Sequence, residues 1–221
     1  MVDFTPTQLS QRIVELGLLE PIEVERAWSE VGGIHGSCED LIRVLQRHEL
    51  LTNLQVDRIY KGERTGFFYG YYKVLYLIGA GTFARVYRSV HRESGRVAAV
   101  KVLRRRHRSE PVQVEQFMRE ARVGMDLHHP NIVAIYEVDP DPRNPYMVME
   151  FVEGQTLREL VAIRKKLDSK TALQLMRDVA NGLAFAATKG VTHRDMKLSN
   201  VLITAQGRAK LVDFGLAALA A

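Results

Sequence analysis

Over the first sixty residues the apolar positions recur with a helical period. The same spacing of apolar residues then returns 32 positions later: Leu9, Ile13 and Leu18-Leu19 recur as Leu41, Leu45 and Leu50-Leu51. Prolines at positions 6 and 21 suit helix starts, because proline is tolerated at the first helical position. Each copy is therefore predicted to be a helical hairpin. Since neither hairpin can bury its apolar side alone, the two should pack together as an all-α domain over residues 1–62.

A different pattern follows the polar, glycine-bounded run at residues 61–66, and we interpret residues 63–71 as a linker. Short apolar runs separated by glycine-containing turns are typical of strands. A helical pattern interrupts them once. The sequence predicts five strands and one helix between residues 72 and 152: strands at 73–78, 85–90, 97–103, 131–138 and 146–151, and a helix at 114–126.

From residue 153 onward the pattern is mainly helical, which makes the whole chain α+β. Helices are predicted at 156–163 and 169–188, and short strands at 201–203 and 209–212. The longer helix carries an apolar stripe along one face. The stripe consists of Leu173, Met176, Ala180, Leu183 and Ala187.

Composition narrows the class of protein. Hydrophobic residues make up 46% of the chain and charged residues 26%, the mix of a soluble globular protein. The single cysteine, Cys38, rules out an internal disulfide and fits a reducing compartment. No apolar run is long enough to cross a bilayer, and the N-terminus lacks a signal pattern, so we expect a cytoplasmic protein without a membrane partner.

The net charge of +5 is modest, and its densest patch is the basic run at residues 104–108. This run has no interleaved aromatic residues and matches no nucleic-acid-binding motif. We interpret it as a solvated loop or a docking point for an acidic or phosphorylated partner, and expect no nucleic-acid partner.

Candidate chemistry begins at the loop Gly79-Ala80-Gly81, which joins the first two predicted strands. Small residues let backbone N–H groups approach phosphates, although such a loop also occurs in ordinary hairpins. Lys101 lies among apolar residues on the third strand and needs an anionic partner. Glu120 on the following helix is the favoured candidate, and Glu115 is the alternative. Together, Lys101 and Glu120 could hold the phosphates of a nucleotide.

Four polar residues near the C-terminal end complete the set. Asp195 could accept a proton from, or orient, an attacking hydroxyl, and Lys197 could neutralise developing phosphate charge. Asn200 and Asp213 offer the hard oxygen ligands that Mg²⁺ prefers. His193 is interpreted as a packed core histidine.

In their order and types, these motifs resemble those of a eukaryotic-type protein kinase, the bacterial Hanks-type Ser/Thr branch, over residues 72–217. The resemblance implies a small lobe at 72–152 with a five-stranded antiparallel sheet and one helix, and a partial large lobe at 153–221. It further implies ATP and Mg²⁺ as cofactors and protein Ser/Thr hydroxyls as substrates. Gly79 and Gly81 would cover the phosphates. The adenine would lie between Val86, Ala99 and Leu202, beside the gatekeeper Met149 and the hinge Glu150-Phe151-Val152.

Three departures from the kinase pattern bear on activity. Ala84 replaces a loop glycine, which should be tolerated. Gly124 stands one turn after Glu120, where kinases place a bulky residue, so we expect a gap there against Phe214. The chain also ends six residues after Gly215. We therefore expect a truncated kinase whose uncovered large-lobe face and tail (216–221) seek a partner, with a homodimer as the prediction.

Two other functions remain open from the sequence. One is an inert or nucleotide-binding pseudokinase that serves as an interaction module, which Gly124 and the short large lobe favour. The other is a small-molecule phosphotransferase, which would share the aspartate and the metal ligands. The intact set Lys101, Asp195, Asn200 and Asp213 favours the protein kinase.

Overall fold

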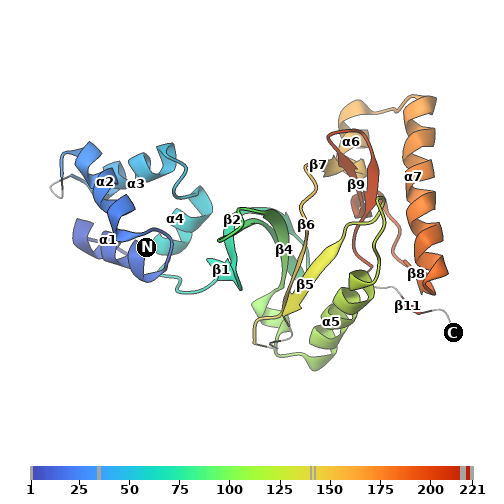
Figure 1. Cartoon of the computed structure of the whole chain (residues 1–221), viewed down its shortest axis with the longest axis horizontal. Coiled ribbons are helices and arrows are strands. Elements are labelled where there is room, and N and C mark those ends of the chain that lie inside the picture. Colours follow the sequence, from blue (N-terminus) through green and yellow to red (C-terminus); the bar gives the residue numbers. More distant parts are fainter. Residues whose placement is uncertain (1, 34–35, 140, 142, 215–217, 220–221) are drawn as a thin grey trace. The chain divides into compact units, whose positions relative to one another are not determined.

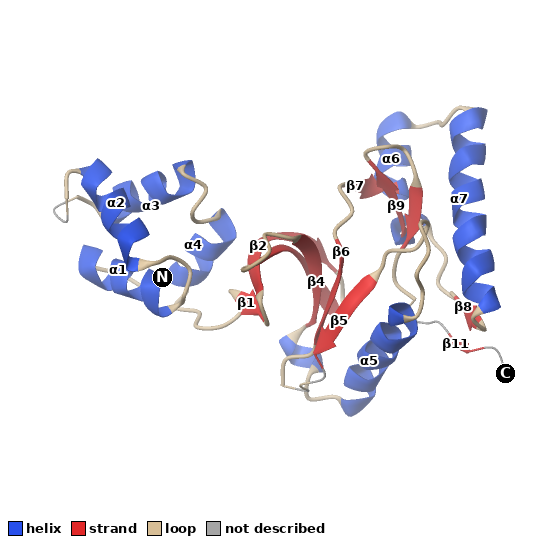
Figure 2. Ribbon diagram, in the orientation of Figure 1, coloured by secondary structure: helices blue, strands red, loops and turns tan. Residues whose placement is uncertain are grey.

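The computed structural model describes residues 2–33, 36–139, 141, 143–214 and 218–219. Figure 1 shows the elements in chain order, and Figure 2 separates helices from strands. The helices are α1 (Pro6–Glu15), α2 (Pro21–Val31), α3 (Cys38–Arg47), α4 (Asn53–Tyr60), α5 (Pro111–Met125), α6 (Leu157–Arg164) and α7 (Ser169–Thr188), with short 3₁₀ turns η1 (Arg105–His107) and η2 (Leu198–Asn200). The strands are β1 (Phe68–Tyr69), β2 (Tyr72–Ala80), β3 (Ala84–His91), β4 (Val97–Leu103), β5 (Ile135–Asp139), β6 (Tyr146–Glu150), β7 (Gly154–Thr156), β8 (Val191–Thr192), β9 (Val201–Thr204), β10 (Ala209–Leu211) and β11 (Ala218–Leu219).

The chain divides into two compact units. The first comprises Met1–Ile78 and Tyr87–Arg96, and the second comprises Gly79–Val86 and Val97–Ala221. None of the described helices is both long and apolar enough to cross a membrane. The mixture of helices and strands agrees with the α+β class, whereas the domain limits at 62, 71 and 152 stay predictions.

The first unit contains the two helical hairpins expected from the repeat. Thr5 and Thr52 cap α1 and α4, each accepting from a backbone N–H three residues on, so the helix starts are satisfied locally. The repeated positions are the core of the bundle: Leu9, Ile13, Leu41 and Leu45 are all 0% exposed. Burial of apolar side chains from both copies explains why the two hairpins form together.

Polar side chains of α4 attach this bundle to strand β2. The Gln55 side chain donates to the Val74 carbonyl over 2.6 Å, and the Thr52 hydroxyl donates to the Leu75 carbonyl over 2.7 Å. Arg58, which is 6% exposed, donates to the Tyr87 hydroxyl over 2.9 Å and also bonds the Gly66 carbonyl. Because these groups are removed from water, the bonds should hold the bundle and the strand as one body.

The largest sheet has six strands in the order β1-β2-β3-β4-β6-β5. Five of them match the predicted strands, and the two-residue β1 is additional. The predicted strand at 131–138 is wrong at its start, because β5 begins at Ile135. Residues 131–133 bond instead to the chain at Leu211, through an isolated parallel bridge from Ile132 and a bond from the Val133 N–H.

In the second unit, α7 has the predicted bounds and buries a face other than the predicted stripe. Its buried residues are Leu175, Asp178, Val179, Gly182 and Ala186. Of the predicted stripe, Leu173 is 71% exposed and Met176 is 52% exposed, which agrees with the expectation that the helix has an uncovered apolar face. The register is set by Asp178, which is 0% exposed and binds Arg208 and the Ala209 N–H at the start of β10. The spacing of apolar residues along the sequence does not reveal a buried ionic contact of this kind.

Candidate functional site

Lys101 lies in the interior of the sheet, where β4 pairs with β6 and Lys101 faces Met147 in the register. Its side chain extends from a strand whose other positions, from Ala98 to Leu103, are all buried. The ammonium lies 2.5 Å from Glu120 Oε1 on α5 and 2.7 Å from Asp213 Oδ1, which follows β10. Glu115 on the same helix is exposed. One buried cation thus joins carboxylates that are distant in sequence.

The three charges shift one another. Burial disfavours a charged Lys101, but the carboxylates of Asp213 and Glu120 outweigh this and raise the pKa of Lys101. Burial also raises the pKa of Glu120 despite the opposing effect of Lys101. For Asp213, Lys101 overcomes the effect of burial and lowers the pKa. Of the two carboxylates, Asp213 is therefore the one that stays ionised more readily.

A second cluster surrounds Asp195. Lys197 Nζ lies 2.6 Å from Asp195 Oδ2, and Asn200 Nδ2 donates to the Asp195 carbonyl over 2.9 Å and to its carboxylate over 3.2 Å. These contacts, the Lys197 bond first, lower the pKa of Asp195 below its usual value. Asn200 is 3% exposed and fixed by η2, so it orients the Asp195 carboxylate.

His193 links the Asp195 segment to the Asp213 segment. It is 2% exposed, as the packing interpretation expected. Its Nε2 lies 3.1 Å from the Val212 carbonyl, and its Nδ1 accepts from the Asp195 N–H over 3.3 Å, which assigns the neutral Nε2–H tautomer. Its ring centroid lies 4.6 Å from that of Phe214. A left-handed backbone at Asp213, with φ of 60°, is a local strain of the kind found at functional sites.

The two clusters open into one hollow of about 670 Å³. Such a volume is in the range that holds a small-molecule ligand. Its lining brings the glycine loop together with residues of both clusters. The lining residues are Gly79, Ala80, Gly81, Thr82, Phe83, Ala84, Val86, Lys101, Leu103, Gln113, Gln116, Phe117, Glu120, Asp195, Lys197, Ser199, Asn200 and Asp213.

The residues expected around an adenine ring form a neighbouring apolar cluster. Ala99 and Met149 are buried in it, and Val86, Val152 and Leu202 pack against them. Val86 also lines the hollow. The side chain of Glu150 does not belong to this apolar cluster, because it forms an ion pair with Lys210 Nζ at 2.6 Å.

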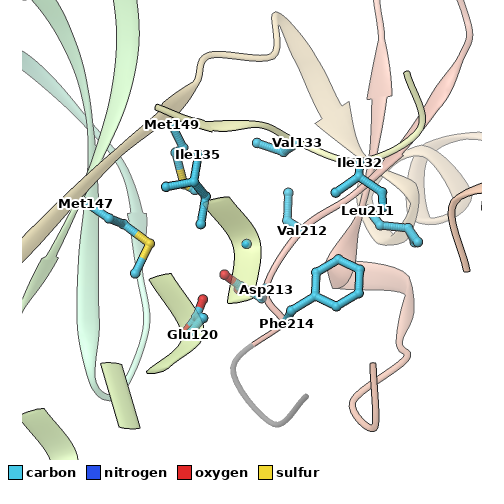
Figure 3. Close-up of a pocket in the computed structure, with 11 residues that line it drawn as sticks. Glu120, Ile132, Val133, Ile135, Met147, Met149, Leu211, Val212, Asp213 and Phe214 are labelled. Carbon is cyan, nitrogen blue, oxygen red and sulfur yellow. The ribbon is translucent and has the colours of Figure 1, made fainter. Parts of the chain in front are cut away.

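The gap expected between Gly124 and Phe214 is present in reduced form, as a small cavity that both residues line. A β-carbon at Gly124 would lie 2.3 Å from Cδ1 of Ile135, so the side chain of Ile135 on β5 occupies part of that space. Figure 3 shows Ile135 with Met149 on one side of the small cavity and Phe214 on the other. This cavity is about 20 Å³, room for about one water. Phe214 is 5% exposed, whereas Gly215 and the tail at 216–217 and 220–221 lie outside the described residues.

Sequence reasoning missed two supporting ion pairs. Lys210 joins β10 to Glu150 at the end of β6, and Arg208, which immediately precedes β10, pairs with Asp178 of α7. Lys210 stands between apolar residues on a short predicted strand, the signal that identified Lys101. Arg208 is exposed and follows a glycine turn, so nothing in its neighbourhood indicated a buried partner.

The site can be tested for its fit to a divalent metal. Among the described residues, no group of three or more His, Cys, Asp or Glu side chains is placed to hold a metal ion. Asn200 and Asp213 nevertheless line the same hollow. Mg²⁺ commonly uses one or two protein oxygens together with substrate phosphates. These two residues therefore fit a metal that arrives with a phosphate ligand.

Comparisons with known proteins agree with this geometry. The family model described as protein kinase domain matches residues 72–221. The chain is 38% identical over 148 residues to serine/threonine-protein kinase PrkC of Bacillus subtilis, covering 67% of this chain and 23% of that protein. It is 36% identical over 157 residues to the probable serine/threonine-protein kinase PknB of Bifidobacterium longum, covering 67% and 23%. It is 35% identical over 153 residues to serine/threonine-protein kinase PknA of Mycobacterium tuberculosis, covering 67% and 36%.

The chain thus spans about a quarter of the length of PrkC and PknB. The matched region contains β2 to β10, and with them both charged clusters and the hollow. Members of this family use ATP and a divalent metal in general. From the sheet, the buried Lys101 group and the match over residues 72–221, we conclude that the chain belongs to the protein kinase domain family.

Proposed function

We propose that the protein containing this chain is a serine/threonine-protein kinase that transfers the γ-phosphoryl group of ATP to Ser or Thr hydroxyls of proteins. The observation that carries the proposal is the buried ammonium of Lys101 between Glu120 and Asp213, in a hollow that Asp195 and Asn200 also line. The printed names of the bacterial relatives support the Ser/Thr class.

The phosphates would enter between the glycine loop and Lys101. Gly79 and Gly81 line the hollow without side chains, and Lys101 supplies positive charge held in place by Glu120. Since Glu120 fixes the ammonium before the nucleotide arrives, little reorganisation is needed on binding.

Asp195 would orient the attacking hydroxyl and accept its proton. Its carboxylate is held by Asn200 and Lys197, and its lowered pKa keeps it ionised at neutral pH. Lys197 is close enough to Asp195 to neutralise phosphate charge as the transfer proceeds.

Asn200 and Asp213 would hold Mg²⁺ together with the phosphates. Lys101, Glu120 and Asp213 carry one positive and two negative charges, so a bare triphosphate would meet the Asp213 carboxylate unfavourably. Bound magnesium supplies the charge neutralisation that this arrangement lacks. Because Asn200 Nδ2 already bonds Asp195, Oδ1 is the atom of Asn200 that would face the cation.

The adenine would lie against the apolar cluster of Val86, Ala99, Met149 and Leu202. The backbone from Glu150 to Val152 would bond its polar edge. The Glu150–Lys210 pair supports this assignment, because it keeps the Glu150 side chain engaged and leaves the backbone for the ligand.

The cellular location, the oligomeric state and the domain limits are also proposals. Cytoplasmic location is supported by the single cysteine, Cys38. Homodimer formation is supported by the exposed Leu173 and Met176 on α7. The monomeric mass by light scattering at high protein concentration would contradict the dimer. We keep residues 1–62, 63–71, 72–152 and 153–221 as helical domain, linker, small lobe and partial large lobe.

Transfer of labelled phosphate to a protein substrate tests the function. The protein that contains this chain should phosphorylate Ser or Thr with MgATP, and Asp195→Asn should abolish the transfer while leaving nucleotide binding intact. Equal transfer by the wild type and Asp195→Asn would overturn the proposal. The pseudokinase alternative is weakened, because Ile135 fills part of the space beside Gly124.

A further inference from the structure

The tip of the glycine loop, residues 81–83, is hydrogen-bonded to the basic segment 104–108 that follows β4. Arg104 Nη1 donates to the Gly81 carbonyl over 3.2 Å, and Arg106 Nη2 donates to the Thr82 carbonyl over 2.8 Å. The Arg104 backbone N–H donates to the Phe83 carbonyl over 2.8 Å. Three consecutive carbonyl groups of the loop are therefore occupied by one short segment.

These bonds determine which way the loop amides face. In a planar trans peptide the C=O of one residue and the N–H of the next point in opposite directions. With the carbonyls of Gly81, Thr82 and Phe83 directed at the arginine segment, the N–H groups of Thr82, Phe83 and Ala84 point away from it. The loop lines the hollow, and neither Arg104 nor Arg106 is among the residues that do so.

The loop itself has little to fix this orientation. Gly79 and Gly81 carry no side chain, and glycine leaves the backbone more conformations than any other residue. Within the loop, the Gly81 N–H bonds the Ala84 carbonyl over 3.0 Å. The side chain of Phe83 is 57% exposed. Bonds from outside the loop are thus needed to restrict its tip.

The arginine segment is well placed to provide them, because it is anchored in the body of the sheet. Arg104 follows Lys101 by three positions, and Arg108 Nε donates to the Leu103 carbonyl over 2.9 Å. The ring of His107 adds a contact, with its centroid 5.1 Å from that of Phe83. The loop tip is therefore held by the segment that directly follows β4, the strand that also carries Lys101.

We propose that Arg104 and Arg106 are positioning residues that hold the phosphate loop by its carbonyl oxygens, so that its amide groups are presented to the nucleotide. The inference rests on the proposed function for its ligand, but the restraint itself is a property of the chain without nucleotide. This role would explain the basic run at residues 104–108 by contacts within the chain.

Hydrogen–deuterium exchange of the 221-residue chain without nucleotide tests the restraint. In the double variant Arg104→Met/Arg106→Met, exchange in residues 79–86 should be faster by about threefold to tenfold, the factor expected for losing a few exposed hydrogen bonds. Exchange in β4 should stay unchanged. Arg105→Met is the matched control, because the exposed Arg105 side chain makes no hydrogen bond or ion pair among the described residues. Unchanged exchange in the loop of the double variant would overturn the inference.

Nucleotide affinity is the second measurement. The double variant should bind MgATP about threefold to tenfold more weakly than Arg105→Met. In the kinase reaction of the protein that contains this chain, KM for ATP should rise while kcat stays within about twofold. A looser loop with unchanged affinity would overturn the positioning role. A wild-type chain that binds no ATP would count against the proposed function alone, because the exchange experiment decides the restraint without nucleotide.

Discussion

The buried ammonium of Lys101 pairs with two carboxylates, and these two contacts organise the chemistry of the chain. Lys101 is 8% exposed and would be costly to bury alone. The carboxylates of Glu120 and Asp213 compensate the charge of Lys101. Their pKa values shift in opposite directions, because burial raises the pKa of Glu120 whereas Lys101 lowers that of Asp213. At the scale of residues, function therefore depends on which charges face each other.

Lys197 controls the ionisation of Asp195. Its bond at 2.6 Å is the main reason that the pKa of Asp195 is below the ordinary value of 3.8. In Lys197→Met this pKa should rise toward that value, and ¹³C NMR of the carboxyl carbon measures it directly. Lys189→Met, at an exposed lysine after α7, should leave it unchanged. An unchanged Asp195 pKa in Lys197→Met would contradict the assigned partner.

Asp178 makes stability depend on pH. Its bonds from Arg208, first among the causes, hold its pKa below 3.8, so its ionic contribution is complete above about pH 5 and is lost as the pH falls through the lowered value. Asp178→Asn should therefore destabilise the chain by about 2–4 kcal/mol at pH 7. The difference from wild type should shrink below about pH 4.

Urea unfolding at a series of pH values tests this dependence. Asp126→Asn, at an exposed aspartate after α5, is the control and should cost less than about 0.5 kcal/mol at every pH. A destabilisation by Asp178→Asn that is the same at pH 7 and pH 3 would show that the charge of Asp178 is not what matters.

At the scale of elements, a few close approaches fix how strands and helices meet. A β-carbon at Gly154 on β7 would lie 1.9 Å from the Ile203 carbonyl oxygen on β9. Backbone atoms have no alternative rotamer, so the two strands would have to separate. The pair also carries Leu202, which belongs to the apolar cluster beside the site.

Gly154→Ala should therefore destabilise the second unit by about 3 kcal/mol or more. Gly79→Ala is the matched control, since its β-carbon would meet Val86 at an ordinary 3.5 Å. Thermal unfolding of the two variants decides between them. Equal melting temperatures would refute the strand approach at Gly154.

Arg58 connects α4 to the segments that follow the helical bundle. It is 6% exposed, donates to the Tyr87 hydroxyl and lies with its guanidinium 5.0 Å from the centre of that ring. Arg58→Met keeps much of the volume but leaves the Tyr87 hydroxyl and the Gly66 carbonyl without this donor. We expect a loss of about 2–3 kcal/mol in urea unfolding.

The exposed Arg26 on α2 is the control for this change, and Arg26→Met should lie within about 0.5 kcal/mol of wild type. If Arg58→Met were as stable as Arg26→Met, the bonds from α4 would contribute nothing to the attachment of the bundle.

At the scale of the whole molecule, the sequence anticipated elements better than the contacts between them. The hairpins, α5, α7 and the strand carrying Lys101 follow from apolar spacing and caps, which are local. The error at residues 131–134 and the partial filling of the gap at Gly124 share another cause. Each depends on a contact between different elements: Ile132 bridges to Leu211, and Ile135 of β5 packs against Gly124 of α5. Spacing along the sequence carries no information about these partners.

The same division holds for the site. Lys101 was recognisable because a lysine in an apolar strand requires an anion, and motif order indicated Asp195, Asn200 and Asp213. The Lys210–Glu150 pair and the bonds from Arg106 to the glycine loop involve ordinary surface residue types. Their partners become evident only once the chain is folded.

The central claim is that the hollow binds MgATP through Lys101 and Asp213, and calorimetric titration of the chain with ATP tests it most directly. With excess Mg²⁺ we predict saturable binding at one site, weakened by about tenfold or more in Lys101→Met. Removal of Mg²⁺ with EDTA should weaken it in the same way, because the Asp213 carboxylate then opposes the phosphates. A folded wild-type chain that binds no ATP, or that binds it equally well without Lys101, would contradict the account.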